Sequence, residues 1–384
     1  MSVVLTDLDE NACRARGSVK WDHAPDGVLP AWVAETDFAP CPAVHAAVQD
    51  AVARGAYGYP PSDARTGLPE ATAAFCARRW GWAVDPSLVV LTGDVMAGIR
   101  LVLETLCDKG PVVVPTPTYP PFLDVVPLTG RPLVPVPLDA DAETAELDLD
   151  RVDAALAAGA RTVLLCNPHN PWGRAFRREE LEALRDVVLR HGARVISDDI
   201  HAPLVLPGTV YVPYASLPGT ADHTTTVLSA SKAFNVPGLK CGQIVTGTAH
   251  DSSVLRRLPP VANHGTSPLG IAANRAAYDE GGPWLDALVR RLAGNRSLLE
   301  DLVAQRLPGV RMRRLEATYL AWLDVRALAG DDPAAVALAR GRVMVNDGAT
   351  FGPGGEGHVR LNIATSPERL QEIVRRLATA WSVD

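Results

Sequence analysis

The sequence contains a lysine that could act as a nucleophile, Lys232, in a turn with Ser229 and Ser231. Residues 224–228, an apolar and β-branched run, predict a strand that ends at this turn, and a second lysine, Lys240, follows it. A lysine with a depressed pKa can form a Schiff base with a carbonyl compound, and serine hydroxyls beside a cation suit a phosphate group. This combination indicates pyridoxal phosphate (PLP), although a serine-flanked lysine on its own is more often an exposed turn residue.

Other polar or aromatic turns also follow apolar runs, and these runs define the elements that must position the lysine. The predicted strands are residues 88–91, 111–115, 131–136, 162–166, 194–197, 224–228 and 243–246. The helices predicted between them are residues 95–107, 148–158 and 177–191. This alternation is typical of a mostly parallel sheet with helices on both faces, in which ligands bind beyond the carboxyl ends of the strands. One edge of the sheet is therefore expected to carry the turns after Leu91, Pro115, Cys166, Ser197 and Leu228.

The two ends of the chain differ from this pattern. Residues 1–40 are rich in tryptophan and proline without periodicity, and they predict an irregular arm that packs on another surface. Helices are predicted at residues 42–54 and 66–80, around an extended loop at 57–61. The elements predicted beyond Ser267 are helices at 267–279, 284–306 and 367–382 and strands at 319–323, 343–346 and 359–363. We expect a smaller α+β domain here that includes part of the arm.

Composition excludes several classes of protein. The 384 residues are 47% hydrophobic, which is enough for a large core and two domains. A formal charge of −7 without basic runs provides no face for nucleic acid, and no apolar run approaches the length of a membrane span. The six cysteines form no Cys-x-x-Cys pair, so we expect reduced, buried thiols and no metal site. The first residues lack the features of a signal peptide, and we expect a cytoplasmic protein.

Motifs along nearly the whole chain resemble those of one enzyme family. They are Lys20-Trp21-Asp22, Leu29-Pro30-Ala31-Trp32-Val33-Ala34, Tyr57-Gly58-Tyr59, Pro168-His169-Asn170-Pro171, Ser197-Asp198-Asp199-Ile200-His201-Ala202, Ser231-Lys232-Ala233-Phe234-Asn235, Ala317-Thr318-Tyr319-Leu320-Ala321-Trp322-Leu323-Asp324, Asn346-Asp347-Gly348 with Phe351-Gly352, and Val359-Arg360-Leu361-Asn362-Ile363-Ala364. Their number and order resemble the fold-type I PLP enzymes of the class I/II aminotransferase superfamily. More narrowly, they resemble the MalY/PatB branch of cystathionine β-lyases, or C–S lyases.

The resemblance implies the PLP-transferase (aspartate aminotransferase-like) fold. This is an α/β fold with a large domain, built on a mostly parallel seven-stranded sheet, and a smaller α+β domain. The implied divisions are an arm at residues 1–45, which includes part of the small domain, a PLP-binding domain at 46–275 and a small C-terminal domain at 276–384.

The resemblance also implies roles for residues around the cofactor ring. Lys232 matches the lysine that forms the Schiff base and then moves protons at Cα, and Asp198 matches the carboxylate that pairs with the pyridine nitrogen. Tyr119 matches the aromatic residue that stacks on the ring, and Asn170 matches the amide that donates to the phenolic oxygen of the ring. His201 is expected near the ring, where it orients Asp198 or that oxygen. Without the resemblance, these residues would be interpreted as ordinary turn, core and surface residues.

A second set of residues matches the phosphate site of the family. It comprises Gly93, Asp94, Val95, Ser229, Ser231 and Lys240. The first three form a turn before a predicted helix, whose free N–H groups can bind a phosphate. Asp94 departs from the apolar residues usual in the family, and we expect its carboxylate to turn away because it would repel a phosphate. Lys240 stands where aspartate-type aminotransferases have arginine, and it would bind as a point charge.

The substrate and a second subunit are expected to contact further residues. Arg360 matches the arginine that holds the substrate α-carboxylate, with help from the backbone of Ala34 and from Asn170. A salt bridge is the alternative role for such an arginine. Tyr59 matches a tyrosine that reaches the phosphate of the neighbouring subunit, and Tyr57 could take that role or contact the substrate. The resemblance therefore implies a homodimer with shared active sites.

Three functions are compatible with these residues. The first is a C–S β-lyase that converts a cysteine S-conjugate such as cystathionine to thiol, pyruvate and ammonia. The second is an aminotransferase, which needs the same residues. A decarboxylating or deaminating outcome in specialised metabolism stays open, because Asp94 and the pair Glu35-Thr36 depart from the family. The third is a regulator that binds a partner, for which Lys232 would be dispensable. The narrow motifs favour the lyase, whereas the residues around the S-substituent, in the arm and at 263–266, match the family poorly.

Overall fold

A seven-stranded sheet forms the centre of the computed structural model, which describes residues 4–138, 145–328 and 332–382. Its strands are β2 (Val89–Thr92), β3 (Val112–Thr116), β4 (Leu133–Pro137), β5 (Thr162–Cys166), β6 (Arg194–Asp198), β7 (Thr224–Leu228) and β8 (Gly242–Thr246). Their spatial order is β2-β8-β7-β6-β5-β3-β4, and β8 runs antiparallel to both of its neighbours. The other pairings are parallel. The prediction of a mostly parallel seven-stranded sheet is therefore confirmed.

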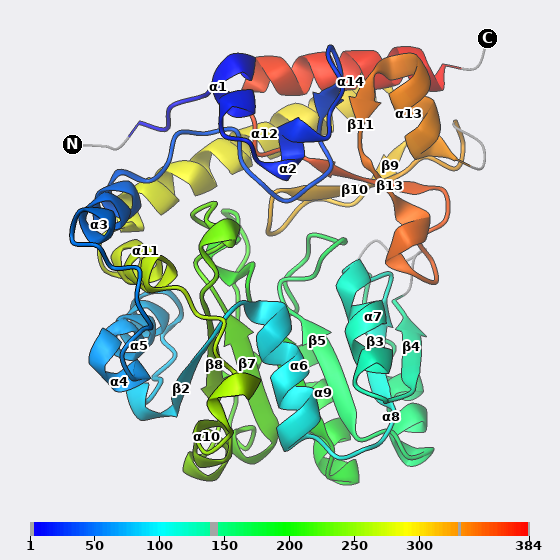
Figure 1. The fold of residues 1–384 in the computed structure, drawn as a ribbon. Helices are drawn as coiled ribbons and strands as arrows, with labels where there is room; N and C mark the ends of the chain where they lie inside the picture. The colour runs from blue at the N-terminus through cyan, green and yellow to red at the C-terminus, as the bar shows by residue number, and fades with distance from the viewer. Residues whose placement is uncertain (1–3, 139–144, 329–331, 383–384) are drawn as a thin grey trace.

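Helices cover both faces of this sheet (Figure 1). One face packs against α6 (Val95–Leu106) and α7 (Pro120–Leu128), and the other against α8 (Leu149–Ala157) and α9 (Arg178–His191). Strand β5 shows why, because its side chains alternate between the two apolar clusters. Leu164 lies in the cluster that contains α6, whereas Leu165 lies in the cluster that contains α9. A strand buried on both faces has the continuous apolar sequence that predicted it.

A second, smaller sheet lies beyond the carboxyl ends of the parallel strands (Figure 1). Its order is β12-β13-β10-β9, and all of its pairings are antiparallel. The strands are β9 (Arg311–Met312), β10 (Leu320–Asp324), β12 (Asn346–Asp347) and β13 (His358–Asn362). The accompanying helices are α12 (Gly282–Arg306), α13 (Pro333–Gly341) and α14 (Pro367–Trp381). The arm joins this region through β1 (Leu29–Pro30), which pairs with β11 (Val343–Met344). The domain boundaries after residues 45 and 275 stay predictions.

The arm is more regular than its sequence predicted. It forms two short helices, α1 (Glu10–Ala15) and α2 (Val19–Asp22). The Asp9 carboxylate caps α1 by accepting from the N–H of Ala12 at 2.7 Å. The buried Asp37 carboxylate accepts from Lys20 Nζ and Trp21 Nε1, both at 2.8 Å. Tertiary hydrogen bonds therefore order these turns, which are too short to show a helical repeat of apolar residues.

Several other elements differ from the prediction. The helix expected at 66–80 is α5 (Leu68–Trp80), and Gly67, whose φ of 70° is left-handed, separates it from α4 (Asp63–Thr66), a short helix that was not predicted. Helices α7, α10 (Ala249–Arg256) and α13 were not predicted. Helix α7 has Pro120 and Pro121 in its first turn and Pro127 in its interior, and this composition is typical of a loop. The strand expected at 343–346 is divided between β11 and β12.

Helices α3 (Pro42–Ala53) and α11 (Pro268–Asp279) lie close to their predicted positions and pack against each other. Within the described residues, no helix combines the length and apolar character needed to cross a membrane.

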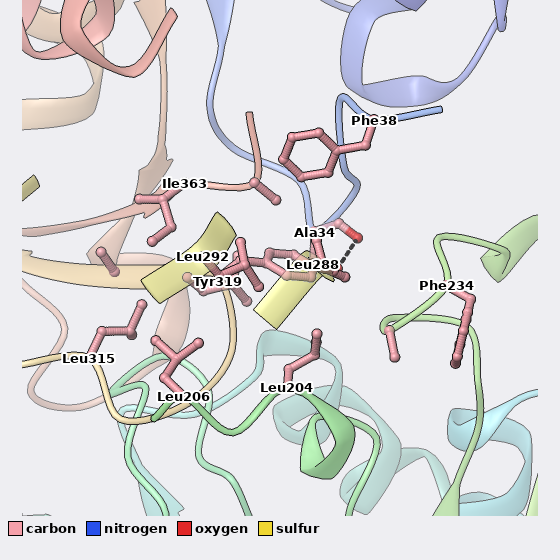
Figure 2. Packing of buried hydrophobic residues seen from close by; sticks show 14 of the residues in the cluster. Ala34, Phe38, Leu204, Leu206, Phe234, Leu288, Leu292, Leu315, Tyr319 and Ile363 are labelled. Atoms are coloured by element: carbon pink, nitrogen blue, oxygen red, sulfur yellow. Dashed lines mark hydrogen bonds between the residues drawn. The ribbon is translucent and has the colours of Figure 1, made fainter. Parts of the chain in front are cut away.

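The largest apolar cluster joins the arm, the lysine turn and the small sheet (Figure 2). It contains Phe38 of the arm, Phe234 of the lysine turn, Leu292 of α12 and Tyr319 beside β10. Each of these side chains is at most 1% exposed. The cluster therefore holds together the segments that border the carboxyl edge of the large sheet.

Truncation of Leu292 tests this core. We expect Leu292→Ala to lower the free energy of unfolding by about 2–5 kcal/mol, because it removes a fully buried side chain and leaves a cavity. The control is Leu189→Ala, the same change on α9 at a side chain that is 51% exposed, with an expected loss of at most about 0.5 kcal/mol. Urea unfolding measures both variants, and equal losses would contradict this account of the core.

Candidate active site

A pocket opens at the carboxyl edge of the large sheet, between that sheet, the arm and β13. The predicted site residues that line it are Ala34, Asp94, Val95, Tyr119, Asn170, Asp198, His201, Ser229, Ser231, Lys232, Lys240 and Arg360. They come from the ends of β2, β3, β5, β6 and β7, from the arm and from the small sheet. Strand topology thus brings together turns that are far apart in the sequence.

Three predicted residues lie outside this pocket. The backbone of Gly93 packs against the backbone of Gly265. A Cβ atom added to Gly93 would lie 3.2 Å from the carbonyl carbon and oxygen of Gly265. Gly93 therefore allows a close backbone approach beside the pocket. Tyr57 and Tyr59 are 69% and 98% exposed, and the hydroxyl of Tyr57 donates to the carbonyl of Val52 at 3.2 Å. A contact of either tyrosine with a neighbouring subunit stays a prediction.

Lys232 directs its amine toward the arm. Nζ donates to the carbonyl oxygen of Ala34 at 3.4 Å. Burial and, to a smaller extent, the charge of Arg360 lower the pKa of Lys232 to about 8, while Glu35 and Asp198 act in the opposite direction. A substantial fraction of the amine is therefore neutral in mildly alkaline solution, and a neutral amine is the form that attacks a carbonyl carbon.

The lysine turn is also tied to the arm by side chains that the sequence did not identify as site residues. Asn235 exchanges two hydrogen bonds with the backbone of Thr36, at 3.0 and 3.3 Å. The hydroxyl of Tyr319 donates to the carbonyl of Ala34 at 3.1 Å (Figure 2). It also lies 3.4 Å from the carbonyl oxygen of Lys232. These bonds fix the position of the lysine backbone relative to the arm.

Asp198 is the last residue of β6 and is 3% exposed. Oδ1 accepts from the N–H of Ile200 at 3.1 Å. Burial, with the charge of Asp199, raises the pKa of Asp198 to about 7, while the Ile200 N–H and the charge of Lys232 act in the opposite direction. The adjacent Asp199 does not line the pocket, because its carboxylate accepts from the hydroxyls of Ser197 and Tyr211. The structure therefore separates the two adjacent acidic residues: Asp198 faces the pocket and can pair with a ligand cation, whereas Asp199 is bound to Ser197 and Tyr211.

Arg360 is held by acceptors from three parts of the chain. Nη1 donates to Oδ1 of Asn170 at 3.0 Å, while Nη2 donates to the carbonyl of Trp32 at 3.0 Å and to Oδ1 of Asn346 at 2.6 Å. Its guanidinium carbon lies 4.9 Å from the ring centroid of Phe351. These contacts position the guanidinium, and they leave the amide nitrogen of Asn170 free to donate to a ligand oxygen. The sequence motif at 346–352 was the signal for Asn346 and Phe351.

His201 is a buried, neutral imidazole in the pocket wall. Burial, together with the charges of Lys232 and Arg360, lowers its pKa to about 3. Its ring lies edge-on to that of Tyr319, with 6.3 Å between the centroids. Among the described residues, Nδ1 of His201 is buried without a hydrogen-bond partner. The donor to Asp198 is the Ile200 N–H, so a role of His201 in orienting Asp198 stays a prediction.

The residues predicted to bind the phosphate already have hydrogen-bond partners within the protein. The Ser229 hydroxyl donates to the carbonyl of Cys241 at 2.7 Å and accepts from the N–H of Ser231 at 3.1 Å, so it holds the turn itself. Lys240 Nζ lies 2.8 Å from Oδ2 of Asp94. The other oxygen of Asp94 accepts from the N–H of Ala97 at 2.8 Å and caps α6. The expectation that the Asp94 side chain turns away is therefore wrong: the helix N–H groups and Lys240 attract its carboxylate.

Apolar residues complete the pocket wall. They are Val33, Met96, Ile200 and Pro237, together with the thiols of Cys166 and Cys241. Val33 and Ile200 lie in the family motifs, whereas the sequence carried no signal for Met96 and Pro237, because apolar residues next to strand ends are ordinary core residues. All six cysteines of the chain are buried and free.

The residues of the pocket fit PLP. The pocket offers an amine for an aldehyde, a carboxylate for a protonated ring nitrogen, and Lys240 with the first turn of α6 for a phosphate. In the described part of the chain, Nδ1 of His201 and Nε of Arg360 are buried without partners, so the pocket has polar atoms that a polar ligand can satisfy. The described residues contain no cluster of side chains suited to a metal ion.

Removing the Asp198 charge tests the electrostatics of the pocket. The pKa of Asp198 is raised from 3.8 to about 7. As the pH rises from 3.8 to about 7, the charged carboxylate therefore destabilises the cofactor-free fold more and more. We expect cofactor-free Asp198→Asn to unfold at a higher temperature than the parent protein at pH 8. This difference should shrink as pH falls toward 4, which thermal unfolding at several pH values measures. A difference that does not change with pH would contradict the prediction.

Comparison with known proteins agrees with this geometry. Residues 33–377 match the family described as "Aminotransferase class I and II". The chain is 39% identical to the cystathionine beta-lyase of Corynebacterium glutamicum, over 95% of this chain and 96% of that protein. It is 35% identical to the cystathionine beta-lyase PatB of Bacillus subtilis, over 95% and 97%. The crystal structure of the PLP-bound C–S lyase from Staphylococcus hominis matches with a TM-score of 0.90 and 27% identity, over 96% of each chain. The chain therefore belongs to the class I and II aminotransferase family.

Proposed function

We propose that the protein is a PLP-dependent C–S β-lyase. It cleaves a cysteine S-conjugate, such as cystathionine, to a thiol, pyruvate and ammonia by α,β-elimination. The observation that carries the proposal is one pocket lined by the Lys232 amine, the Asp198 carboxylate and the Arg360 guanidinium. Support for the lyase reaction comes from the relatives named cystathionine beta-lyase, which match along nearly the whole chain.

The proposed cofactor site assigns a role to each end of the pocket. When bound, PLP supplies an electron-withdrawing ring that stabilises negative charge at the substrate Cα atom. Asp198 holds a proton on the ring nitrogen, and this ion pair satisfies a carboxylate whose burial otherwise favours protonation. Asn170 donates its amide N–H to the ring oxygen, and Tyr119 packs on the ring. Lys232 anchors the aldehyde, and Ser231, Lys240 and the start of α6 bind the phosphate.

The substrate residues follow from the same geometry. Arg360 binds the α-carboxylate, and its orientation is set in advance by Asn170, Trp32 and Asn346. The neutral amine of Lys232 removes the Cα proton. The bond between Cβ and sulfur then breaks, sulfur leaves with the bonding electrons, and it takes up a proton to give the thiol. The remaining enamine reacts with water to give pyruvate and ammonia.

We also propose a homodimer in the cytoplasm. The side chains of Tyr57 and Tyr59 project from the described surface, as expected for residues that complete a neighbouring site. Light scattering on purified protein tests the dimer, and a monomeric mass at micromolar concentration would exclude it. The six free, buried thiols suit a reducing compartment, and localisation of a tagged chain tests this.

A substrate assay without added oxo acid separates the lyase from an aminotransferase. We expect cystathionine or an S-alkylcysteine to yield thiol, pyruvate and ammonia in equal amounts. The same assay on Lys232→Ala should yield no product, because the base and the covalent anchor are both lost. A product that forms only after an oxo acid is added would identify an aminotransferase, and release of carbon dioxide would identify a decarboxylating reaction. Borohydride fixation of PLP at a residue other than Lys232 would contradict the proposed site.

Replacement of Arg360 tests the carboxylate site. We expect Arg360→Ala to lower kcat/KM at least about tenfold, mainly through a higher KM, because a charged, two-pronged contact to the substrate is lost. The control is Arg311→Ala, at an exposed arginine paired with Asp324 on the small sheet, which should leave kcat/KM unchanged. An unchanged KM in Arg360→Ala would show that another group binds the carboxylate.

A further inference from the structure

We propose that Asp94 weakens the binding of the PLP phosphate, because it competes for the two groups that would hold that phosphate. This inference rests on the proposed function, since it concerns the same cofactor site. It assigns Asp94 a role in setting cofactor affinity, which makes PLP in this chain easier to exchange.

The competing contacts are direct. One oxygen of Asp94 accepts from the N–H of Ala97 in the first turn of α6, at 2.8 Å. The other oxygen lies 2.8 Å from Nζ of Lys240. A helix N-terminus and a nearby lysine are the usual partners of a bound phosphate. In this chain, a carboxylate already engages both.

Few other groups in the pocket can replace Lys240. Among the described residues that line the pocket, the remaining lysine and arginine side chains are Lys232 and Arg360. Lys232 reaches toward Ala34, and Arg360 is bound to Asn170 and Asn346. His201 is neutral, because burial lowers its pKa to about 3. The phosphate therefore depends on Lys240, and any charge that neutralises Lys240 acts directly on the affinity for PLP.

Ser229 and Ser231 do not fully replace the phosphate contacts that Asp94 occupies. The hydroxyl proton of Ser229 is used by the carbonyl of Cys241, at 2.7 Å. The N–H of Ser231 is used by the Ser229 oxygen, at 3.1 Å. A phosphate dianion that enters this site would meet the like charge of Asp94 and would have to share Lys240 with it. The opposite effect would follow if Asp94 served to orient Lys240 toward the phosphate, so the sign of the change in affinity distinguishes the two roles.

The test is the dissociation constant of PLP for cofactor-free Asp94→Asn, measured by absorbance titration and by equilibrium dialysis. Asparagine caps helices about as well as aspartate, so the substitution removes the charge and keeps the acceptor for Ala97. We expect the dissociation constant to fall about tenfold and the release of PLP to slow. Titration with pyridoxal, which lacks the phosphate, should give the same dissociation constant for the variant and the parent protein.

A matched control is Asp148→Asn. Asp148 also caps a helix, α8, by accepting from the N–H of Arg151 at 3.0 Å, and its carboxylate also pairs with a cation, the Arg151 side chain. It does not line the pocket, so the PLP dissociation constant should stay unchanged. An unchanged or higher dissociation constant in Asp94→Asn would overturn the inference, and so would an equal gain for pyridoxal.

These outcomes separate the inference from the proposed function. If the parent protein binds PLP at Lys232 and cleaves a cysteine S-conjugate, but Asp94→Asn binds PLP no more tightly, the proposed function stands and the inference fails. If the parent protein does not bind PLP at all, both fail. In a Lys240→Ala background, the gain from Asp94→Asn should be smaller than in the parent protein, because the competition for Lys240 is gone. An undiminished gain in that background would overturn the assignment of Lys240 as the contested group.

Discussion

The hydrogen bond from Arg360 to Asn170 links the four-stranded sheet to the seven-stranded sheet, and the site depends on it. Arg360 lies on β13 of the small sheet, whereas Asn170 follows β5 of the large sheet. The same guanidinium also binds the carbonyl of Trp32 in the arm. Because the guanidinium is planar, acceptors from three segments fix both its position and its plane. A substrate carboxylate thus binds a preorganised guanidinium, because the entropy of ordering the Arg360 side chain is lost during folding and not during substrate binding.

Burial gives the pocket a second common property, since it shifts its titratable groups toward their neutral forms. The pKa of Lys232 is lowered to about 8, that of His201 is lowered to about 3, and that of Asp198 is raised to about 7. Charged groups on a ligand reverse this tendency when they pair with these residues. A cofactor with a protonated ring nitrogen supplies such a charge to Asp198. Asp94 is the exception, because burial raises its pKa but Lys240 and the helix N–H groups lower it below its usual value, and it stays charged.

Local sequence patterns predicted most of the large sheet and the edge of that sheet at which the site residues gather. Strand β7 lies where its β-branched run predicted it, and α9 follows from its apolar repeat. Convergence of the strand-end turns follows from parallel topology, so the positions of Asp198 and Lys232 at one edge could be inferred before the structure was known. Helix α7 could not be predicted in this way, because it holds Pro120 and Pro121 in its first turn and Pro127 in its interior, and so many prolines are typical of a loop.

The sequence by itself determined the fold class, the lysine turn and the chemical character of the pocket, because these depend on local periodicity and residue type. Only the tertiary structure decided which charges meet. Asp94 and Lys240 are 146 positions apart, and no local pattern shows that their side chains pair. Likewise, tertiary packing decided that Asp198 enters the pocket while its neighbour Asp199 binds Ser197 and Tyr211. The physical reason is that such pairs form from the packing of separate elements, and packing depends on the whole chain.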